Sequence, residues 1–394
     1  MSLFPLIMLQ QNTKKRKYCN GNKGFLLFAI LIFIALDSLG QKEIIIRDKA
    51  RISSKRQKMV SGVNTILKPG TESVYIATYI ADDKNSQEYY GKSENVYIAI
   101  QEIDIKHPQD VQRYKRVLRK GQNIGGHILT TIPYNPMIAE NNGTVALIFE
   151  GSLDGKSRGL ISVNLYNKGK QITKLRSIDY LKVKIRDRIV SLSPESYLDI
   201  VSSHGYKTIR PGCFVADLNP FKDKNHVYHL AVGCAPDNYI LILKSKDLKI
   251  WEYERILSLK GNETDLCYNH NVLHYVVRSG NDIYYGENNQ RNMKIARSIA
   301  SRPRFILKDS CLFLLCNVAG ESKKDHLRST VSFRKCLPTG MEELYRLKKK
   351  ESIQYYDVIT YKDMDYLVYS TDNESNVGFS KGELQIMQLP FVLK

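Results

Sequence analysis

From residue 60 to the end of the chain, short apolar runs alternate with polar turns. The runs are rich in Ile, Val, Leu and Tyr, and the residues between them are mostly Gly, Asn, Asp and Pro. Runs of this kind, bounded by turn residues, are typical of β-strands. The spacing therefore predicts an all-β protein whose clearest strands are Ser73–Ile80, Asn95–Ile103, Thr144–Ser152, Val227–Cys234, Tyr239–Ser245, Leu273–Ser279, Cys311–Val318 and Asp365–Thr371.

Helical periodicity is scarce along the chain. The best local candidate for a helix is Pro338–Glu351. The strand–helix–strand alternation that builds parallel sheets is missing from the sequence. Many antiparallel strands must therefore share several sheets, and a β-propeller protects the edges of its sheets by radial repetition. We expect a β-propeller, with a pair of sandwich domains as the structural alternative.

Three proline-containing segments each precede a predicted pair of strands. They are Pro133–Pro136, Ile209–Pro211 and Ser301–Pro303. We expect the innermost strand of a blade to begin at each of them, close to the central axis. Side chains at these positions would face the channel in which propellers bind ligands.

The N-terminal segment has the composition of a secretory signal. Phe25–Leu36 is a run of twelve apolar residues that follows a basic stretch and precedes small residues near Gly40. Such a run is short for a membrane span, although an uncleaved anchor is the alternative. We predict a signal peptide over residues 1–40, a linker over 41–60 and a single β-propeller domain over 61–394. The mature protein would be secreted or periplasmic, with no stable membrane span.

The positive charge of the chain raises the question of whether it binds nucleic acids or anionic glycans. The formal net charge is +19, but Lys and Arg are scattered and accompany no nucleic-acid-binding motif. We therefore expect no nucleic acid partner, and attraction to anionic glycans is the alternative explanation of the charge.

The cysteines and the known catalytic motifs indicate no cofactor. The seven Cys form no CxxC pair and no metal-ligand spacing. Cys234, Cys267, Cys311 and Cys316 stand in or beside apolar runs, where Cys behaves as a small buried residue; disulfides after export stay possible. The sequence has no P-loop, dinucleotide fingerprint, HExxH or GxSxG motif. We predict neither a metal nor another cofactor.

The segment Ser245–Trp251 (SKDLKIW) contains the only Trp of the chain. Its Ser-x-Asp-Leu-x-x-Trp pattern resembles the blade-turn motif of glycan-active propellers and a shortened sialidase Asp box. The resemblance implies that Ser245 and Asp247 bind the backbone of a hairpin and that Trp251 packs between sheets. The motif is structural, so it supports a fold rather than a reaction.

Two further segments resemble the sialidase family. An Asn-Glu pair ends at Glu263, and Arg278 follows it by fifteen residues across a predicted hairpin. Gln354–Ile359 (QYYDVI) is similar to the C-terminal tyrosine segment of the same family. The resemblance covers residues 60–390 and implies a six-bladed sialidase-like β-propeller, with five blades as the runner-up.

The resemblance also implies a set of site residues. Tyr355 would be the nucleophile, and Glu263 would draw charge off its phenol. Arg278 and Arg302 would bind a substrate carboxylate, and an Asp would protonate the leaving group; Asp83 is the residue assigned to this role, with its neighbour Asp82 as the alternative. A sialoside carries a carboxylate beside its anomeric carbon, which would repel a carboxylate nucleophile, so a Tyr acts in its place. Guanidinium groups bind such carboxylates with two parallel hydrogen bonds. The chain would then be a retaining exo-glycoside hydrolase that acts on a glycan or glycoconjugate, with anionic glycans among the candidate substrates.

Two other functions stay open. Residues 205–268 also resemble the five-bladed fructan and arabinan hydrolases, in which Glu263 would be an acid. Where a sialidase has the Arg of its first blade, Ser73–Thr78 contains none. The third hypothesis is therefore a secreted propeller that binds a glycan or a protein without catalysis. The structural alternative for Arg302 and Arg304 is to brace a blade.

Overall fold

The computed structural model describes residues 59–81, 96–107, 115–167, 175, 177–207, 212–216, 218–235, 238–288, 292–297, 303–318, 328–337, 340–348, 353–371, 383–389 and 393. They all belong to one structural unit, which spans Glu43–Lys394. The predicted signal peptide lies outside the described residues. Among the described residues, no helix has the length and apolar character needed to span a membrane.

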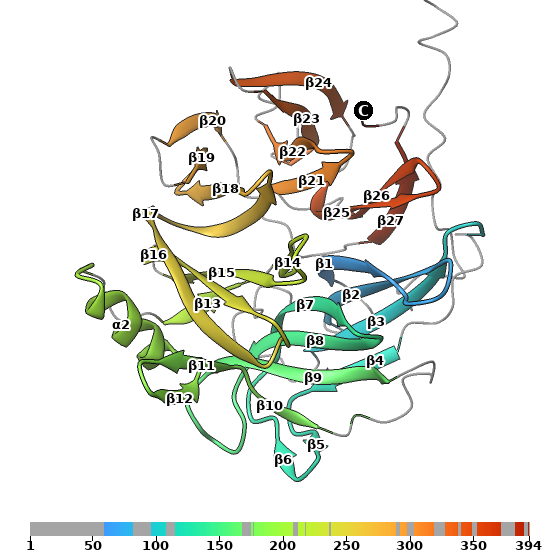
Figure 1. Cartoon of the computed structure of the whole chain (residues 1–394). Helices are drawn as coiled ribbons and strands as arrows, with labels where there is room; N and C mark the ends of the chain where they lie inside the picture. Colours follow the sequence, from blue (N-terminus) through green and yellow to red (C-terminus); the bar gives the residue numbers. More distant parts are fainter. Residues whose placement is uncertain are drawn as a thin grey trace, which may run out of the picture. The chain divides into compact units, whose positions relative to one another are not determined.

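The strands form six blades around a common axis, so the fold is a β-propeller (Figure 1). Blade one consists, from the axis outwards, of β1 (Met59–Leu67), β2 (Ser73–Ala81), β3 (Val96–Asp104) and β4 (Lys115–Arg119). Blade two consists of β7 (Tyr134–Asn141), β8 (Thr144–Gly151), β9 (Gly159–Asn167) and β10 (Ile178–Tyr180). A small ribbon between these blades pairs β5 (Asn123–Ile124) with β6 (His127–Ile128).

Blades three and four share one strand, β17 (Ile250–Asn269), which is 20 residues long. In blade three, the first half of β17 follows β13 (Cys213–Val215), β14 (Phe221–Lys222), β15 (Tyr228–Ala235) and β16 (Asn238–Ser245), from the axis outwards. In blade four, the second half of β17 is innermost and is followed by β18 (Val272–Ser279), β19 (Asp282–Glu287) and β20 (Met293–Arg297). The two blades are therefore one continuous hydrogen-bonded sheet.

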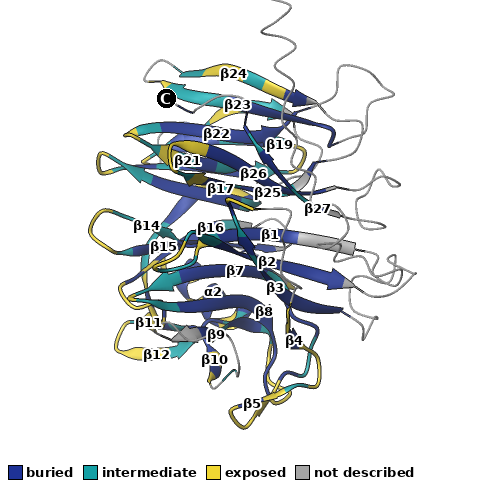
Figure 2. Ribbon diagram, turned by 90° about the vertical axis from the view of Figure 1, so that its right-hand side faces the viewer, coloured by how far each residue is buried: buried dark blue, intermediate teal, exposed yellow. Residues whose placement is uncertain are grey.

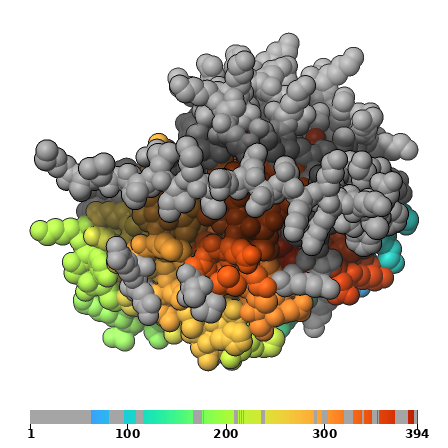
Figure 3. Space-filling model, turned by 90° about the horizontal axis from the view of Figure 1, so that it is seen from above, coloured from blue at the N-terminus to red at the C-terminus, as the bar shows by residue number. Residues whose placement is uncertain are grey.

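The last two blades complete the ring. Blade five consists of β21 (Arg304–Lys308), β22 (Cys311–Asn317), β23 (Thr330–Leu337) and β24 (Gly340–Lys348). Blade six consists of β25 (Gln354–Tyr361), β26 (Met364–Thr371) and β27 (Glu383–Gln388). Among the innermost strands, β1 contacts β7, β17 contacts β21, and β21 contacts β25. β1 also contacts β25, so the first blade lies against the last. Yellow-to-red residues of the later blades form most of the coloured surface in Figure 3.

Each pair of neighbouring blades encloses its own hydrophobic cluster. Residues of blades two and three, for example, form the cluster around Trp251 and Tyr197, and residues of blades one and six form the cluster around Val63 and Val368. Successive residues of β2 alternate between two clusters: Val74 and Ile76 belong to one, and Tyr75 and Ala77 to the other. Both faces of a blade are thus buried, which explains why the strands read as nearly continuous apolar runs (Figure 2).

The turn between β16 and β17 has the structure that the Ser245–Trp251 motif predicts. The Ser245 hydroxyl donates to the carbonyl of Ile250 and accepts the N–H of Leu248, and Asp247 accepts the N–H groups of Lys249 and Ile250. Trp251 is fully buried in the cluster between blades two and three. The motif therefore closes one hairpin and anchors it to a neighbouring blade.

The helix predicted at Pro338–Glu351 is wrong. Gly340–Lys348 is instead the strand β24, which pairs with β23. β24 is the outermost strand of its blade, so several of its positions, such as Glu342 and Arg346, are exposed and charged. Its sequence therefore has the mixture of polar and apolar residues that is also found in an amphipathic surface helix.

The helix α2 (Pro194–Ser203) was not predicted. It begins with a capping box between Ser193 and Ser196, with Pro194 in the first turn. A hairpin of β11 (Lys182–Ile185) and β12 (Arg188–Ser191) precedes it and extends blade three by pairing β11 in parallel with β17.

Candidate functional site at the propeller axis

Four of the innermost strands begin with the same irregularity. A β-bulge near the start of β1, β7, β25 and the blade-four half of β17 contains a residue with positive φ: Gly62 (65°), Asn135 (49°), Tyr355 (44°) and Glu263 (40°), respectively. A bulge adds one residue to a strand and turns the side chains that follow it. Hydrogen bonds between residues just after these bulges, from Asn64 to Pro136 and from Thr65 to Asp357, join neighbouring blades at one level. We call this end of the axis, where the innermost strands begin, the strand-start mouth.

Glu263 and Arg278 form an ion pair at this mouth. Arg278 Nη1 lies 2.9 Å from Glu263 Oε1, and both side chains are largely buried. The pair forms because Asn262 and Arg278 are opposite each other on β17 and β18, and the bulge directs Glu263 towards the guanidinium. Arg278 Nε also donates to the carbonyl of Gly280, at 3.1 Å. The other carboxylate oxygen of Glu263, Oε2, is buried and has no hydrogen-bond partner among the described residues.

Tyr355 occupies in β25 the position that Glu263 occupies in β17. Its ring packs against the hydrophobic cluster between blades one and six and is partly buried. Asp83 and Arg302 lie outside the described residues. The structure therefore places Glu263, Arg278 and Tyr355 around one end of the axis and brings Glu263 and Arg278 into contact, while the chemical roles predicted for all five residues stay predictions.

Below these residues, Arg304 links carboxylates of two different blades. Its Nε donates to Asp357 Oδ1 at 2.9 Å, and its Nη1 lies 3.4 Å from Asp265 Oδ1. Asp265 and Asp357 each stand two residues after a bulge, at Glu263 and Tyr355 respectively, and both are buried. Burial raises the pKa of the Asp265 carboxyl, an effect that the Arg304 charge opposes. Arg304 thus braces blades four, five and six, as the structural alternative for this residue anticipated.

Both aspartates also accept backbone hydrogen bonds from the next blade. Asp265 accepts the N–H of Phe305, and Asp357 accepts the N–H and the hydroxyl of Thr65. Asn219 links the innermost strands of blades one and two in a similar way. Its side-chain oxygen accepts the N–H of Ile138 on β7, and its side-chain nitrogen donates to the carbonyl of Thr65 on β1. Hydrogen bonds of these three side chains therefore connect the innermost strands of neighbouring blades. The carboxylates of Asp265 and Asp357 are already occupied by these donors.

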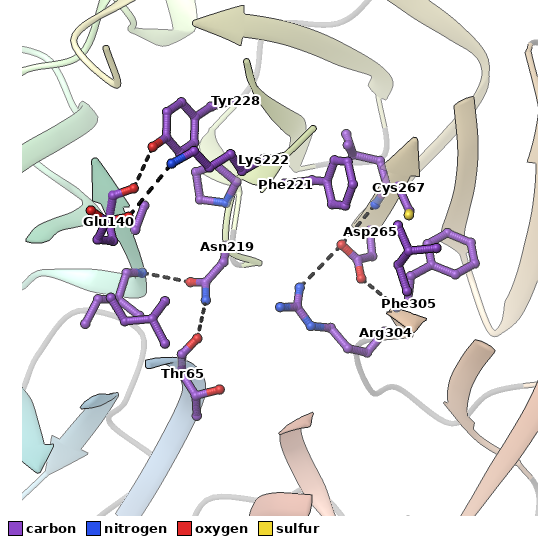
Figure 4. A pocket seen from close by; sticks show the side chains of 16 residues that line it. Thr65, Glu140, Asn219, Phe221, Lys222, Tyr228, Asp265, Cys267, Arg304 and Phe305 are labelled. Atoms are coloured by element: carbon purple, nitrogen blue, oxygen red, sulfur yellow. Dashed lines mark hydrogen bonds and ion pairs between the residues drawn. The ribbon is translucent and has the colours of Figure 1, made fainter. Parts of the chain in front are cut away.

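A cavity of about 300 Å³ lies beside this network (Figure 4). Asp265, Arg304 and Asn219 form part of its wall, together with the aromatic rings of Phe221 and Phe305. At its edge, Lys222 Nζ lies 3.8 Å from Glu140 Oε2 and 5.1 Å from the centre of the Tyr228 ring. Glu263, Arg278 and Tyr355 are not among the described residues that line it. The cavity is therefore separate from those members of the predicted catalytic set that the structure describes.

Neither metal ligands nor disulfides form the site in the described part of the chain. No group of His, Cys, Asp and Glu side chains there is arranged to hold a metal ion. Cys267, Cys311, Cys316 and Cys336 carry free thiols, and Cys267 and Cys316 are buried, as their apolar surroundings in the sequence predict. Burial raises the pKa of the Cys316 thiol to about 11, so it is protonated at neutral pH.

Asp265 and Asp357 were not predicted to lie at the axis. A signal for them was present, because each follows the predicted site residue by two positions: Glu263-Thr-Asp265 and Tyr355-Tyr-Asp357. In a regular strand this spacing places both side chains on one face, but the bulge breaks the alternation. Only the structure shows that the second residue of each pair faces the axis.

Comparison with known proteins identifies the class of fold. No protein-family model and no curated protein sequence matches the chain. Solved structures match well. The sialidase of Trypanosoma rangeli in complex with sialic acid superimposes with a TM-score of 0.57 at 10% sequence identity, over 84% of this chain and 54% of that protein. This chain therefore spans about half the length of that sialidase.

Two other structures support the same class. A Hadza microbial sialidase matches with a TM-score of 0.55 at 11% identity, over 85% of this chain and 66% of that one. An alpha-L-arabinofuranosidase of Fusarium graminearum matches with a TM-score of 0.51 at 12% identity, over 90% of this chain and 99% of that one. At these identities the likeness concerns the fold. The chain has the β-propeller fold that sialidases share with arabinan-degrading glycosidases, as its sequence predicted.

Proposed function

We propose that the chain is a glycan-active protein whose ligand binds at the strand-start mouth, and that it is an exo-glycoside hydrolase of the sialidase type. One observation carries the proposal: Glu263 and Tyr355 occupy equivalent bulges of blades four and six, at the same end of the axis, with Arg278 in contact with Glu263. Non-glycine residues with positive φ are uncommon and are concentrated at functional sites. The propeller fold of known glycosidases supports the same class of ligand.

In the proposed reaction, the phenolic oxygen of Tyr355 attacks the anomeric carbon of a terminal sugar. Glu263 takes the phenol proton on Oε2, which is buried and has no hydrogen-bond partner in the part of the chain that the structure describes. The glycosidic C–O bond breaks, and Asp83 gives its proton to the leaving oxygen. Water then cleaves the tyrosyl–sugar bond, the proton that it loses returns to Asp83, and Glu263 gives its proton back to the Tyr355 phenolate that leaves the sugar. Arg278 and Arg302 hold an anionic group of the sugar.

The proposal includes export of the mature protein. The signal-like segment before residue 41 supports it, and residues 61–394 would then form the secreted domain. Glycosidic substrates on cell surfaces or in secretions would be accessible to such a protein.

Hydrolysis of an aryl sialoside tests the enzymatic proposal. We expect release of the aryl group by the full chain and a loss of roughly 100-fold or more in kcat for Tyr355→Phe, since the nucleophile is removed. Tyr361→Phe, on the same strand β25, is the matched control and should retain activity. An aryl arabinofuranoside serves as the second substrate, because arabinan hydrolases share the fold. Equal activity of Tyr355→Phe and the unmodified chain would exclude Tyr355 as the nucleophile.

A glycan-binding protein without catalysis is the second candidate. It is favoured by the full engagement of Asp265 and Asp357 with donors and by the ion pair of Glu263 with Arg278, which leave few free carboxylate oxygens at the axis. Binding of a sialylated glycan with no turnover of either aryl glycoside would establish this function instead.

A further inference from the structure

A second polar cluster lies between blades two and three, outside the predicted catalytic set. Glu150 is near the end of β8, opposite Tyr134 at the start of β7. Because Tyr134 immediately precedes the bulge residue Asn135, Glu150 lies at the strand-start mouth. Arg158 belongs to the segment that joins β8 to β9 at the same end. We refer to Glu150 and Arg158 as the blade-two pair.

The polar atoms of the blade-two pair are only partly used. Arg158 Nε lies 3.3 Å from Glu150 Oε1, which is an ion-pair distance, but the two atoms do not align as a hydrogen bond. Glu150 Oε1 and both Nε and Nη2 of Arg158 are buried without a hydrogen-bond partner in the described part of the chain. The other oxygen of Glu150 accepts the backbone N–H of Phe214, on β13 of blade three. One acceptor and two donors therefore face each other unsatisfied.

Such unsatisfied buried groups cost free energy unless something satisfies them. Glu150 is 3% exposed, and burial raises the pKa of its carboxyl to about 7, against the opposing effects of the Arg158 charge and the Phe214 N–H. Buried groups with strongly shifted pKa values are frequent at functional sites. Unlike Asp265 and Asp357, Glu150 thus keeps an oxygen available.

We infer that the blade-two pair is a subsite for a hydroxyl group of the ligand, and this inference rests on the proposed glycan ligand at the strand-start mouth. A hydroxyl accepts hydrogen bonds from Arg158 and donates one to Glu150, so it satisfies both. An anionic group would meet the carboxylate, and a cation would meet the guanidinium. Neutral hydroxyls are the polar groups that sugars present in greatest number.

Access to the subsite depends on Arg158. Its side chain is 34% exposed, and its guanidinium lies over the Tyr134 ring, 5.0 Å from the ring centre. The Tyr134 ring in turn lies 5.5 Å from that of Tyr79. Because the Arg158 side chain is long and only partly buried, it is the group that moves to admit a hydroxyl, while the aromatic rings stay as the fixed wall.

Titration calorimetry with 3′-sialyllactose tests the subsite in the full chain carrying Tyr355→Phe, so that turnover does not interfere. We expect Glu150→Gln and Arg158→Gln each to weaken binding by roughly tenfold, the loss of one hydrogen bond to a charged group. Lys156→Gln, an exposed neighbour in the same segment, should leave the affinity unchanged. Arg158→Lys retains the charge without the two-donor edge and should bind as weakly as Arg158→Gln. Thermal unfolding verifies that each variant is folded.

The pH dependence separates this role from a purely structural one. A ligand hydroxyl that donates to Glu150 favours its ionised form, so affinity should rise between pH 6 and pH 8, around the Glu150 pKa of about 7, and Glu150→Gln should abolish the rise. Unchanged affinity in the Glu150 and Arg158 variants, or no binding by the parent chain, overturns the inference. Binding with this pattern but without aryl sialoside turnover leaves the subsite intact and overturns the enzymatic proposal. Turnover of the aryl sialoside by the full chain, together with unchanged binding affinity in the Glu150 and Arg158 variants, supports the enzymatic proposal and overturns the subsite.

Discussion

Arg304 holds carboxylates of two blades in a place where neither is accessible to solvent. Asp265 and Asp357 are 4% and 2% exposed, and each is bonded both to the guanidinium and to a backbone N–H of a neighbouring strand. These donors occupy the carboxylate oxygens, so few acceptor sites remain for a ligand or a reacting group. We therefore assign these residues to the stability of the ring rather than to catalysis.

Removing one of these carboxylates should destabilise the whole propeller. Asp357→Ala breaks the buried ion pair with Arg304 Nε and takes the acceptor from the N–H and hydroxyl of Thr65, so we expect a loss of about 3–5 kcal/mol in the free energy of unfolding. Chemical denaturation measures it. Asp199→Ala, at an exposed position of α2, should change the stability by less than about 0.5 kcal/mol. A loss for Asp357→Ala no larger than that of this control would contradict the bracing role.

His229 makes the junction of blades three and four sensitive to acid. Its two ring nitrogens lie 2.7 Å from Glu254 and 3.3 Å from Asp223, and its ring lies against that of Tyr268. Burial acts to raise the pKa of both carboxyls, but hydrogen bonds from His229 and, for Asp223, from backbone N–H groups outweigh it. The pKa of each carboxyl is therefore lowered.

The sign of the pH effect follows from these lowered pKa values. A carboxyl with a lowered pKa in the folded state contributes stability above its ordinary pKa of about 4, and this contribution is lost as the pH falls through the lower folded value. We expect unfolding free energies measured from pH 7 to pH 3 to decrease below about pH 4, and less steeply in His229→Gln. His107→Gln, at an exposed position, is the control. Parallel curves for His229→Gln and the unmodified chain would refute the assignment.

Among the elements, the bulged innermost strands are the feature that sequence patterns could not reveal. The strands themselves were predictable, because both faces of each blade are buried and the runs are apolar throughout. The Ser245–Trp251 turn was predictable from its side-chain chemistry. A bulge, however, depends on pairing with a partner strand, and its effect on side-chain direction is invisible in a single sequence. Glu263 and Arg278 could be paired from their spacing across a hairpin. Asp265 and Asp357 could not be placed, because the bulge before each of them decides which way its side chain faces.

Substitution at Asn135 tests the bulge geometry directly. Its φ of 49° is accessible to Asn and Gly but is strained for a β-branched residue. We expect Asn135→Gly to change the stability by less than about 1 kcal/mol and Asn135→Val to lower it by about 1–3 kcal/mol. Thermal unfolding distinguishes the two. If valine were tolerated as well as glycine, the strand would not need the left-handed conformation there.

For the molecule as a whole, stability resides in six blade-to-blade clusters of buried residues rather than in one central core. Inner and middle strands contribute to these clusters, whereas outer strands such as β4 and β24 are exposed at several positions. This arrangement explains why regularly repeated apolar runs sufficed to predict a propeller. The number of blades was implied by the family resemblance and is seen directly in the sheets.

Hydrogen exchange should follow the same division. Amides of β2, β8 and β22 are expected to exchange only through global unfolding, and those of β4 and β24 much earlier, since outer strands open locally at lower free energy. Exchange measured by mass spectrometry on peptides of each strand checks this order. Uniform protection across inner and outer strands would show that the blades open only as complete units.

The strand shared by blades three and four also limits how the gene for this protein could be rearranged. Elsewhere a blade boundary falls in a connecting segment, such as that between β24 and β25, where new chain ends would interrupt no ladder of backbone hydrogen bonds. Between blades three and four the boundary lies inside β17 itself. Circular permutation or division into two complementing fragments should therefore succeed at the first kind of boundary and fail at the second, so that these two blades are inherited as a single indivisible module.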